Sequence, residues 1–522
     1  MINYQSTRQI GIEEFKTPFE LKLSAENRWV KLASILPWDE LAKIYHRKLS
    51  KNKGRRSLDA RMVIGALIIK HKEGLSDQRT IESIQENIYQ QYFLGLSKYT
   101  YEPIFDSSLF VSIRKRLGAA SFDAMIQELM IVAAPNAPRT KLLSEEKKAE
   151  LKPSVAPSAP EAAGALSREG SAEEQTAAAS SEAKENSGML LVDMTVAPAD
   201  IAYPTDIELL NSAREKTEEL IDVLYAALPE EQKKEKPRTY RKRARKEYLA
   251  IAKQRKKPAK SIRKALRKQL GYVRRNMTTV HRLLDIRPNG LSGSQMKEFW
   301  VIQELHRQQA EMYQEQTHRI SDRIVSITQP HVRPIVRGKA SAPTEFGAQV
   351  SVSVQNGFSR IHKIEWDAYN ESVDLQGQIE SYKTHHGYYP EIVLADKKYG
   401  TKENRAFMKT RGIVYGGSPL GRPKKDGTRS DLLSKEIVNQ RNHIEGKFGT
   451  GKRSYGLDCI RARRADTSES WIAMIFFMMN VSLLLKVFGS PFLSLFYFLS
   501  ERVSALVDLP KRAVQRLHVV VS

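Results

Sequence analysis

The sequence predicts an α/β protein: a mixed sheet with helical cover, interrupted by a large basic helical insertion and preceded by an all-α domain. The first 138 residues carry helical patterns only. The later segments follow the order strand, large insertion, hairpin, helix, strand, helix, strand, helix. The insertion, about residues 205–330, has a helical pattern throughout. A chain of 522 residues suits about three domains, and 41% hydrophobic residues are enough for sizeable cores.

The N-terminal region, residues 1–138, is expected to contain several short helices. Helical patterns cover residues 57–74, 75–96 and 106–118. The first begins near Ser57, a favourable N-cap, and ends at Gly74, whereas Ser76 or Asp77 is expected to cap the second. Short helices joined by tight turns suit a helix-turn-helix-like DNA-binding domain, although they also suit any small bundle.

Two further segments complete the expected domain organisation. Residues 139–188 are rich in Ala, Ser, Glu and Pro and contain neither an aromatic residue nor Ile, which predicts a disordered linker. Residues 491–522 are expected to form a C-terminal tail helix after a catalytic domain over 189–490.

One stretch, residues 471–488, is apolar enough to resemble a membrane span. It carries Asn480 and Lys486, so we expect a buried core helix and keep membrane association as the weaker alternative. The N-terminus has no apolar signal core, and the single cysteine, Cys459, excludes an intrachain disulfide and a cysteine-based metal site. These features suit a reducing cytoplasm.

Strand patterns reappear around three stretches of the second half. Residues 188–198 predict a buried strand ending near Asp193, and "EIVLAD" predicts a compact strand that closes on Asp396. Between them, "GAQVSVSVQNG" alternates and ends in an Asn-Gly turn, which predicts a hairpin with the following segment. A helix is expected over residues 430–449.

The chain has a net charge of +24, which favours a polyanionic partner, nucleic acid first. Residues 233–275 hold 20 Lys or Arg against two Glu. A charge run is often only a solvated face, but so one-sided a block favours contact with phosphates. The candidate DNA-binding residues in this insertion are Arg241, Lys242, Arg243, Arg245, Lys256 and Lys257.

Three acids stand out by position: Asp193, Asp396 and, in the last predicted helix, Glu445. Carboxylates brought together repel one another, and a divalent cation removes that penalty. Oxygen ligands without Cys or a His-rich motif favour Mg²⁺ or Mn²⁺ over zinc. Two such ions about 3.5–4 Å apart can support phosphodiester chemistry.

The helix around Glu445 places two cations beside the carboxylate. Arg441, Glu445 and Lys452 fall within about 40° of one another on one face, provided that the helix continues past Gly449 and Gly451. Such a face can bind a metal and hold phosphates. The alternative is an ordinary Arg–Glu surface pair, and spacing alone does not decide between them.

Taken together, these segments resemble bacterial insertion-sequence transposases of the DDE type. "LLVDMTVAPADIAYPTDIELLNSARE" is similar to the first-aspartate segment, "EIVLADKKYGT" to the second and "RNHIEGKFGTGKRSYGLDCIRAR" to the glutamate helix. "HKEGLSDQRTIESIQENIYQQYFLGL" resembles part of the helical domain that precedes the core in one subgroup. Two positions depart from the pattern: Val438 replaces the signature Tyr, and Lys398 replaces a small residue.

The resemblance implies an RNase H-like catalytic core and a mechanism. Asp193, Asp396 and Glu445 would bind two Mg²⁺ or Mn²⁺ ions, and Arg441 and Lys452 would position DNA phosphates. The expected partners are double-stranded DNA, as terminal inverted repeats and as target, and further copies of the chain, with no membrane. The expected location is the bacterial cytoplasm, at the nucleoid. A metal-dependent nuclease without strand transfer and a silent DNA-binding derivative remain alternatives.

Overall fold

The computed structural model describes residues 22–50, 57–133, 185–233, 235–336, 344–417 and 435–489. Almost all of the linker predicted over 139–188 and all of the tail helix predicted over 491–522 lie outside these residues. The predicted domain boundaries therefore stay predictions. Within the described residues the protein is a mixed α/β structure, as the order of patterns predicted.

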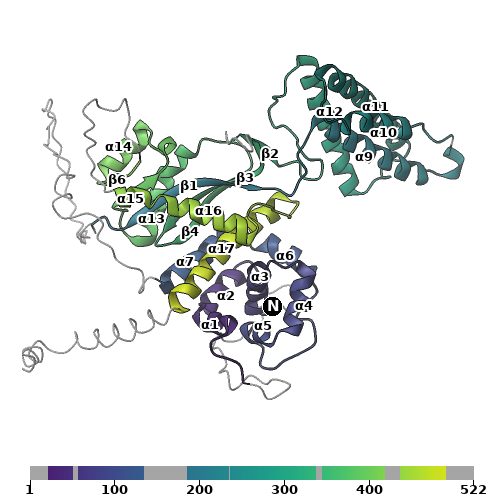
Figure 1. Cartoon of the computed structure of the whole chain (residues 1–522). Coiled ribbons are helices and arrows are strands. Elements are labelled where there is room, and N and C mark those ends of the chain that lie inside the picture. Colours follow the sequence, from purple (N-terminus) through teal and green to yellow (C-terminus); the bar gives the residue numbers. More distant parts are fainter. Residues whose placement is uncertain are drawn as a thin grey trace, which may run out of the picture.

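A mixed sheet forms the centre of the second half (Figure 1). Among the described residues its six strands are β1 (Met189–Pro198), β2 (Arg333–Val336), β3 (Thr344–Gln355), β4 (Phe358–Glu365), β5 (Ile392–Ala395) and β6 (Val414–Tyr415). The order is β2–β3–β1–β5–β6, with β4 also on β3. β1 pairs antiparallel with β3 and parallel with β5, so the sheet changes direction at β1.

The predicted hairpin is confirmed. β3 and β4 pair antiparallel, and Asn356 and Gly357 between them have φ of 48° and 81°. Positive φ at both central residues is what a tight two-residue hairpin turn requires, and Asn-Gly adopts it at little cost. The turn sequence therefore sets where β3 ends.

The position of Asp193 within its strand differs from the prediction. β1 continues for five residues beyond Asp193, because Met194–Pro198 pair with β3. Its other neighbour, β5, stops at Ala395, opposite Val192. Asp193 therefore lies mid-strand, at the point where β1 loses its partner on one side.

Helices cover both faces of the sheet. On one face α13 (Leu375–His386) and α14 (Lys402–Thr410) pack against Leu190 and Val192. On the other, α16 (Asn442–Tyr455) and α17 (Ala465–Gly489) pack against Leu191 and its neighbours. A short α15 (Lys435–Asn439) precedes α16. The single helix predicted over 430–449 is thus wrong in its described part: the chain turns tightly at Gln440 and Arg441 before α16 begins.

The N-terminal region is helical, as predicted. Its helices are α1 (Arg28–Ile35), α2 (Trp38–His46), α3 (Ala60–Glu73), α4 (Asp77–Glu86), α5 (Ile88–Phe93), α6 (Leu109–Arg116) and α7 (Ala119–Ala133). Asp59, not Ser57, caps α3, because its carboxylate accepts from the N–H of Arg61. Ser76 caps α4, Gly74 ends α3 in the left-handed conformation, and Asn87 divides the second predicted helix into α4 and α5.

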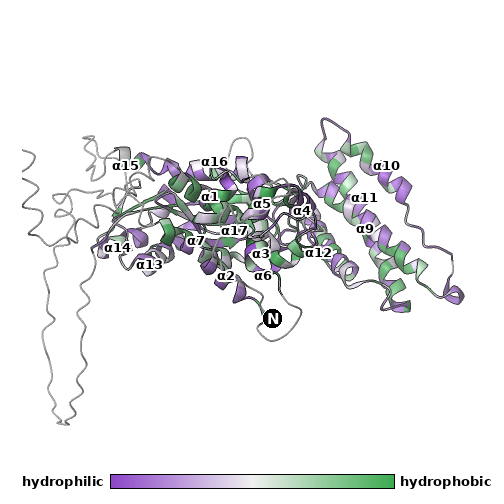
Figure 2. Ribbon diagram, turned by 90° about the horizontal axis from the view of Figure 1, so that it is seen from below, coloured by the Kyte–Doolittle hydropathy of each residue, from purple (hydrophilic) through white to green (hydrophobic). Residues whose placement is uncertain are grey.

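The apolar helix α17 joins the N-terminal helices to the sheet (Figures 1 and 2). It packs against α7, α6, α3, α1 and β4, and Met474, Phe477 and Val481 share a core with the N-terminal helices. It is long and apolar enough to cross a membrane, but 67% of its most apolar window is buried within the protein. The core-helix reading therefore accounts for its apolar surface.

The helical insertion forms a lobe that extends away from the sheet (Figure 1). Its helices are α9 (Asp206–Ala226), α10 (Arg241–Ala252), α11 (Ala259–Ile286) and α12 (Gly293–Glu315). α9, α11 and α12 pack around Leu210, Val273 and Ile302 at one level and around Leu224, Val280 and Phe299 at another. The lobe thus has an apolar core of its own. Residues 316–332, at the end of the predicted helical stretch, are not helical.

Candidate active site

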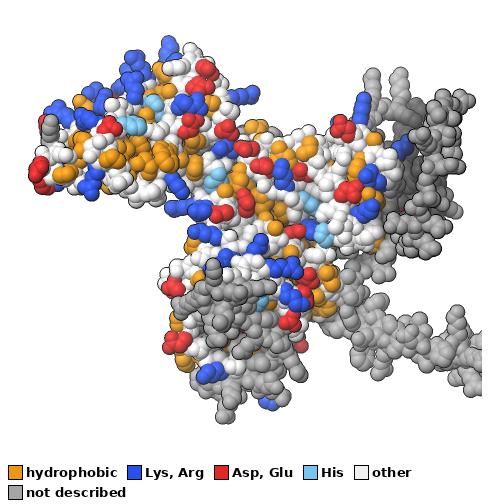
Figure 3. All heavy atoms as spheres, turned by 180° about the vertical axis from the view of Figure 1, so that it is seen from behind, with side chains coloured by type: hydrophobic (Ala, Val, Ile, Leu, Met, Phe, Trp, Pro, Cys, Tyr) orange, Lys and Arg blue, Asp and Glu red, His pale blue; other side chains and the backbone are white. Residues whose placement is uncertain are grey.

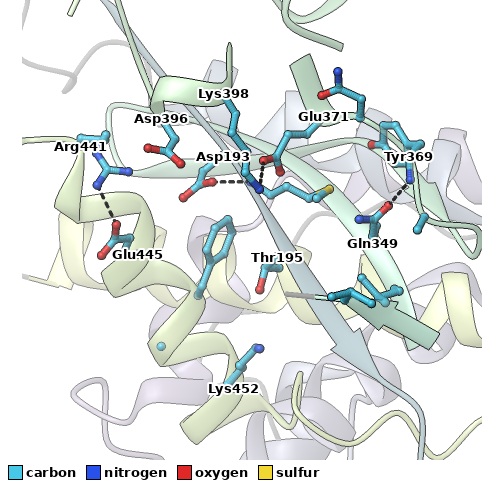
Figure 4. A pocket seen from close by; sticks show the side chains of 17 residues that line it. Asp193, Thr195, Gln349, Tyr369, Glu371, Asp396, Lys398, Arg441, Glu445 and Lys452 are labelled. Carbon is cyan, nitrogen blue, oxygen red and sulfur yellow. Dashed lines mark hydrogen bonds and ion pairs between the residues drawn. The ribbon is translucent and has the colours of Figure 1, made fainter. Parts of the chain in front are cut away.

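One cavity, of about 790 Å³, opens beside the carboxyl end of β5. Four acids line it: Asp193 on β1, Asp396 after β5, Glu445 on α16 and Glu371 in the turn after β4. Lys398, Arg441 and Lys452 also line it (Figure 4). The three acids and two cations singled out from the sequence therefore meet in one cavity.

The register of two parallel strands brings the two aspartates together. Val192 lies opposite Ala395, so Asp193 and Asp396 follow at the same level. Alternation along β1 turns Asp193 to the same face as Leu191, which is the face that α16 covers. The Asp396 carboxylate accepts from the N–H of Lys397 at 2.7 Å and caps the following turn. The fold thus aims both carboxylates toward the glutamate helix.

Asp193 is electrostatically strained in this position. Burial raises its pKa to about 6, and the nearby Glu371 and Asp396 add to the rise. The N–H of Met194, which donates to the carboxylate at 2.8 Å, and the Arg441 guanidinium oppose it. Ionising Asp193 therefore costs more free energy than ionising an exposed aspartate, and a further positive charge would lower that cost.

The face predicted on the glutamate helix exists. α16 continues past both glycines to Tyr455, so Glu445 and Lys452 lie on one helix with Arg441 at its N-cap. Gly451 lets α16 pack closely against Leu457 and against Met479 of α17. A Cβ at this position would lie only 3.1 Å from the Leu457 side chain and 3.2 Å from the Met479 sulfur. Arg441 and Glu445 form an ion pair at 3.1 Å, as the surface-pair alternative predicted, but both side chains line the cavity.

The sequence did not single out Glu371 as a site residue. It lies in a 3₁₀ turn, Glu371–Asp374, away from any strand pattern, so no signal in the sequence distinguishes it from a loop acid. In the structure it is buried beside Asp193 and pairs with Lys398 at 3.2 Å. Lys398, one of the two departures from the family pattern, thus places a cation among the carboxylates. Val438, the other departure, packs half-buried against the core under the sheet.

The carboxylates fit a hard divalent cation by their chemistry. Oxygen ligands suit Mg²⁺ or Mn²⁺, and the raised pKa of Asp193 reflects repulsion that a cation would relieve. Within the described part of the chain, no three His, Cys, Asp or Glu side chains lie close enough to hold one ion together. Figure 4 shows why: Asp193 and Asp396 lie near each other, whereas Glu445 is directed to Arg441.

The predicted DNA-binding residues of the insertion divide into two groups. Arg241 pairs with Asp222 at 3.0 Å and Arg243 with Glu247 at 3.5 Å, so both are engaged within the lobe. The other four are exposed and form no ion pair with any described residue: Lys242, Arg245, Lys256 and Lys257. Figure 3 shows Lys and Arg side chains gathered along the outer edge of the lobe.

This division predicts different effects of two substitutions in the insertion. Lys242→Gln with Arg245→Gln is expected to weaken DNA binding about tenfold and to lower the slope of log affinity against log salt by about 2, since each phosphate contact contributes about 0.9. Arg241→Gln is expected to change that slope less and to reduce the thermal stability of the lobe. Fluorescence anisotropy across a salt series and thermal melting measure the two effects. Equal slopes for both variants would contradict the division.

Comparison with known protein families bears on both halves of the chain. A transposase domain (DUF772) matches residues 18–116, and a transposase DDE domain matches residues 393–482. These are the domains of a DDE-type insertion-sequence transposase. The second match spans β5 to α17, so it includes Asp396 and Glu445 but not Asp193. The first covers the helices from α1 to α6.

A curated relative is similar to a shorter part of this chain. An uncharacterized protein, ORF8 in the nfe locus of Rhizobium meliloti, is 28% identical over 116 residues, or 22% of the chain. The chain spans about half (54%) of that relative's length. No solved structure matches the chain.

Proposed function

We propose that the protein is an active DNA transposase, which cleaves DNA at the ends of an insertion sequence and joins those ends to target DNA. The observation that carries the proposal is the meeting of Asp193, Asp396 and Glu445, from three separate elements, in one cavity with Arg441 and Lys452. The strand order β4–β3–β1–β5–β6, with its change of direction at β1, supports an RNase H-like core.

In this proposal the carboxylates hold Mg²⁺ or Mn²⁺, two ions in all, as the resemblance implies. The bound cations would supply charge stabilisation at the reacting phosphate. Lys398 already offsets part of the negative charge, through Glu371, before any cation binds. Arg441 has two alternative partners. In the free protein it pairs with Glu445, and it would bind a DNA phosphate once Glu445 binds a metal cation.

The proposed reaction has two steps. Water attacks the scissile phosphate, an O–P bond forms, and the bond to the 3′ oxygen breaks, so that the 3′ oxygen takes up a proton and becomes a hydroxyl. That hydroxyl then attacks a phosphate of target DNA, forming a new phosphodiester and releasing the target's own 3′ oxygen. Lys452 and Arg441 would position both phosphates; the two residues lie about three helical turns apart along α16. No protein nucleophile takes part.

The test incubates purified protein and Mg²⁺ with DNA that carries the inverted repeats flanking the coding region. We expect cleavage at the repeat ends and joined products with a second DNA. Glu445→Gln is expected to lower cleavage about a thousandfold, the loss of roughly 4 kcal/mol of transition-state stabilisation. Glu403→Gln, an exposed acid on α14 outside the cavity, is the matched control. Nicking at random positions would favour the nuclease alternative, and binding without cleavage the silent derivative.

The remaining parts of the proposal concern partners and location. Transposases act on DNA, and the net charge of +24 suits such a partner. Assembly of several copies on paired ends and a location at the nucleoid in the cytoplasm are implied by the family resemblance. Sedimentation of the protein with and without paired repeat ends tests the first of these.

A further inference from the structure

A second cavity, of about 990 Å³, lies between the N-terminal helices and the segment that joins α16 to α17. We name it the interdomain groove. One wall is residues 452–464, and the other is formed around the starts of α4 and α6, at Ser76 and Ser108. Lys452 lines both this groove and the carboxylate cavity, so the two adjoin at its side chain.

The first wall carries an excess of positive charge. Its cations, with Lys452 at the border, are Lys452, Arg453, Arg461, Arg463 and Arg464, against one acid, Asp458. Arg464 pairs with Asp466 at 2.9 Å. Arg453 and Arg463 are exposed and form no ion pair with a described residue. This wall therefore presents guanidinium groups that are available to an anion.

The backbone of the first wall is fixed to the strand that carries Asp193. Ile460 bridges to Ala199 just beyond β1, and its N–H donates to the Pro198 carbonyl at 2.8 Å. Ile460 and Ala462 pack into the core, whereas Arg461 and Arg463 are exposed and line the groove. This is the alternation of an extended segment. The two arginines thus project from a backbone whose position relative to the active site is set.

The charges of the opposite wall are largely paired with one another. Asp77 pairs with Lys70 at 3.0 Å and with Arg114 at 2.7 Å, and both cations lie over the Trp471 ring, at 5.1 and 5.6 Å from its centroid. His71 packs edge-on against the same ring and is buried. The charge of the groove is therefore set mainly by the first wall, which favours a polyanion.

We propose that the interdomain groove binds the sugar-phosphate backbone of the duplex whose scissile phosphate lies in the carboxylate cavity. The inference rests on the proposed function for the identity of that phosphate. A strand that passes Lys452 stays against positive charge as it moves from one cavity to the other. Arg461 and Arg463 are placed to contact successive phosphates, since guanidinium forks match phosphate oxygens. The N-terminal domain then forms one wall of the DNA site instead of acting as a separate module.

The test measures DNA binding without divalent cations, so that no chemistry is needed. The probes are a duplex carrying the terminal repeat and a duplex of unrelated sequence. Arg461→Gln with Arg463→Gln is expected to weaken binding of both about tenfold and to lower the salt slope by about 2. Arg453→Gln alone is expected to lower it by about 1. The charge-matched control is Lys402→Gln with Lys409→Gln, two exposed residues on α14 and outside the groove.

Single methylphosphonates, which remove one phosphate charge, then locate the contact. In the wild type, methylphosphonates beside the cleavage point are expected to weaken DNA binding. In the Arg461/Arg463 variant, the same methylphosphonates are expected to have no further effect on binding. The inference is overturned if the variant keeps the wild-type slope or the wild-type interference pattern, or if the control pair weakens binding equally. Loss of cleavage by the wild type with the groove contacts intact would instead refute the proposed function.

Discussion

Replacing Asp193 by Asn is expected to stabilise the metal-free protein at about pH 8 and, at the same time, to reduce DNA cleavage about a thousandfold or more. The two effects share one cause. Burial, together with Glu371 and Asp396, disfavours the ionised carboxylate and raises its pKa to about 6. The charge that the proposed chemistry needs is thus one that the fold alone does not favour.

The sign of the stability effect follows from the raised pKa. Well below the unfolded-state pKa of about 4, the carboxyl is protonated in both the folded and the unfolded chain, so the variant has no advantage. As pH rises toward and beyond 6, the unfolded chain ionises freely while the folded chain does so against the penalty of burial. The wild type is expected to lose roughly 1–3 kcal/mol of folding free energy across this interval, and the variant none of it.

Thermal unfolding in EDTA at about pH 4 and about pH 8 checks this expectation. Asp285→Asn, an exposed acid on α11, is the control and is expected to change stability little at either pH. Added Mg²⁺ is expected to raise the unfolding temperature of the wild type more than that of Asp193→Asn, since a ligand stabilises the state that binds it. If the variant were destabilised at about pH 8, Asp193 would not be the strained carboxylate described above.

Replacing Asn480 by Leu is expected to destabilise the protein by roughly 2–5 kcal/mol, although it makes α17 more apolar. Asn480 is fully buried. Its carbonyl accepts from the N–H of Ser359 at 2.9 Å, and its amide donates to the Ser359 carbonyl at 2.7 Å. Both partners belong to the backbone of β4, so the substitution leaves one buried donor and one buried acceptor unpaired.

The same substitution separates the two readings of the apolar helix. A core helix loses stability when Asn480 becomes Leu, whereas a membrane span would insert more readily. Chemical denaturation and flotation with lipid vesicles measure these two outcomes. Met478→Leu, a volume-conserving change at another buried position of α17, is the control and is expected to cost less than about 1.5 kcal/mol. Vesicle binding that increases with unchanged stability would contradict the core assignment.

Several elements followed directly from local chemistry. The Asn-Gly pair fixed the hairpin, because its two residues tolerate positive φ. Gly74 and Ser76 ended one helix and began the next, as their capping preferences predict. Where capping signals were nearly equivalent, as for Ser57 and Asp59, the pattern chose the wrong residue. The two candidates lie two residues apart, and the structure shows that the Asp59 carboxylate makes the cap hydrogen bond.

The residues of the candidate site also differ in how far the sequence revealed them. Asp193, Asp396 and Glu445 were recognisable from apolar strands, helix spacing and family resemblance, but their meeting depends on strand register and on the packing of α16 against β1. Glu371 had no comparable signal, because a turn acid becomes a site residue only when the β4 connection folds back over the cavity. The ion pairs that engage Arg241 and Arg243 depend on partners within the lobe, one of them 19 residues away.

By itself, the sequence determined the class of the protein. Local patterns and composition reveal the charge, the helical insertion, the aspartates that follow apolar runs and the helix that carries Glu445. The tertiary structure decided which of these groups act together. It set Asp193 mid-strand at the limit of β5, joined the N-terminal helices to the sheet through α17, and opened a groove between them. The reason is physical: propensity and periodicity act over a few residues, whereas burial, register and ion pairing depend on residues that are distant in the chain.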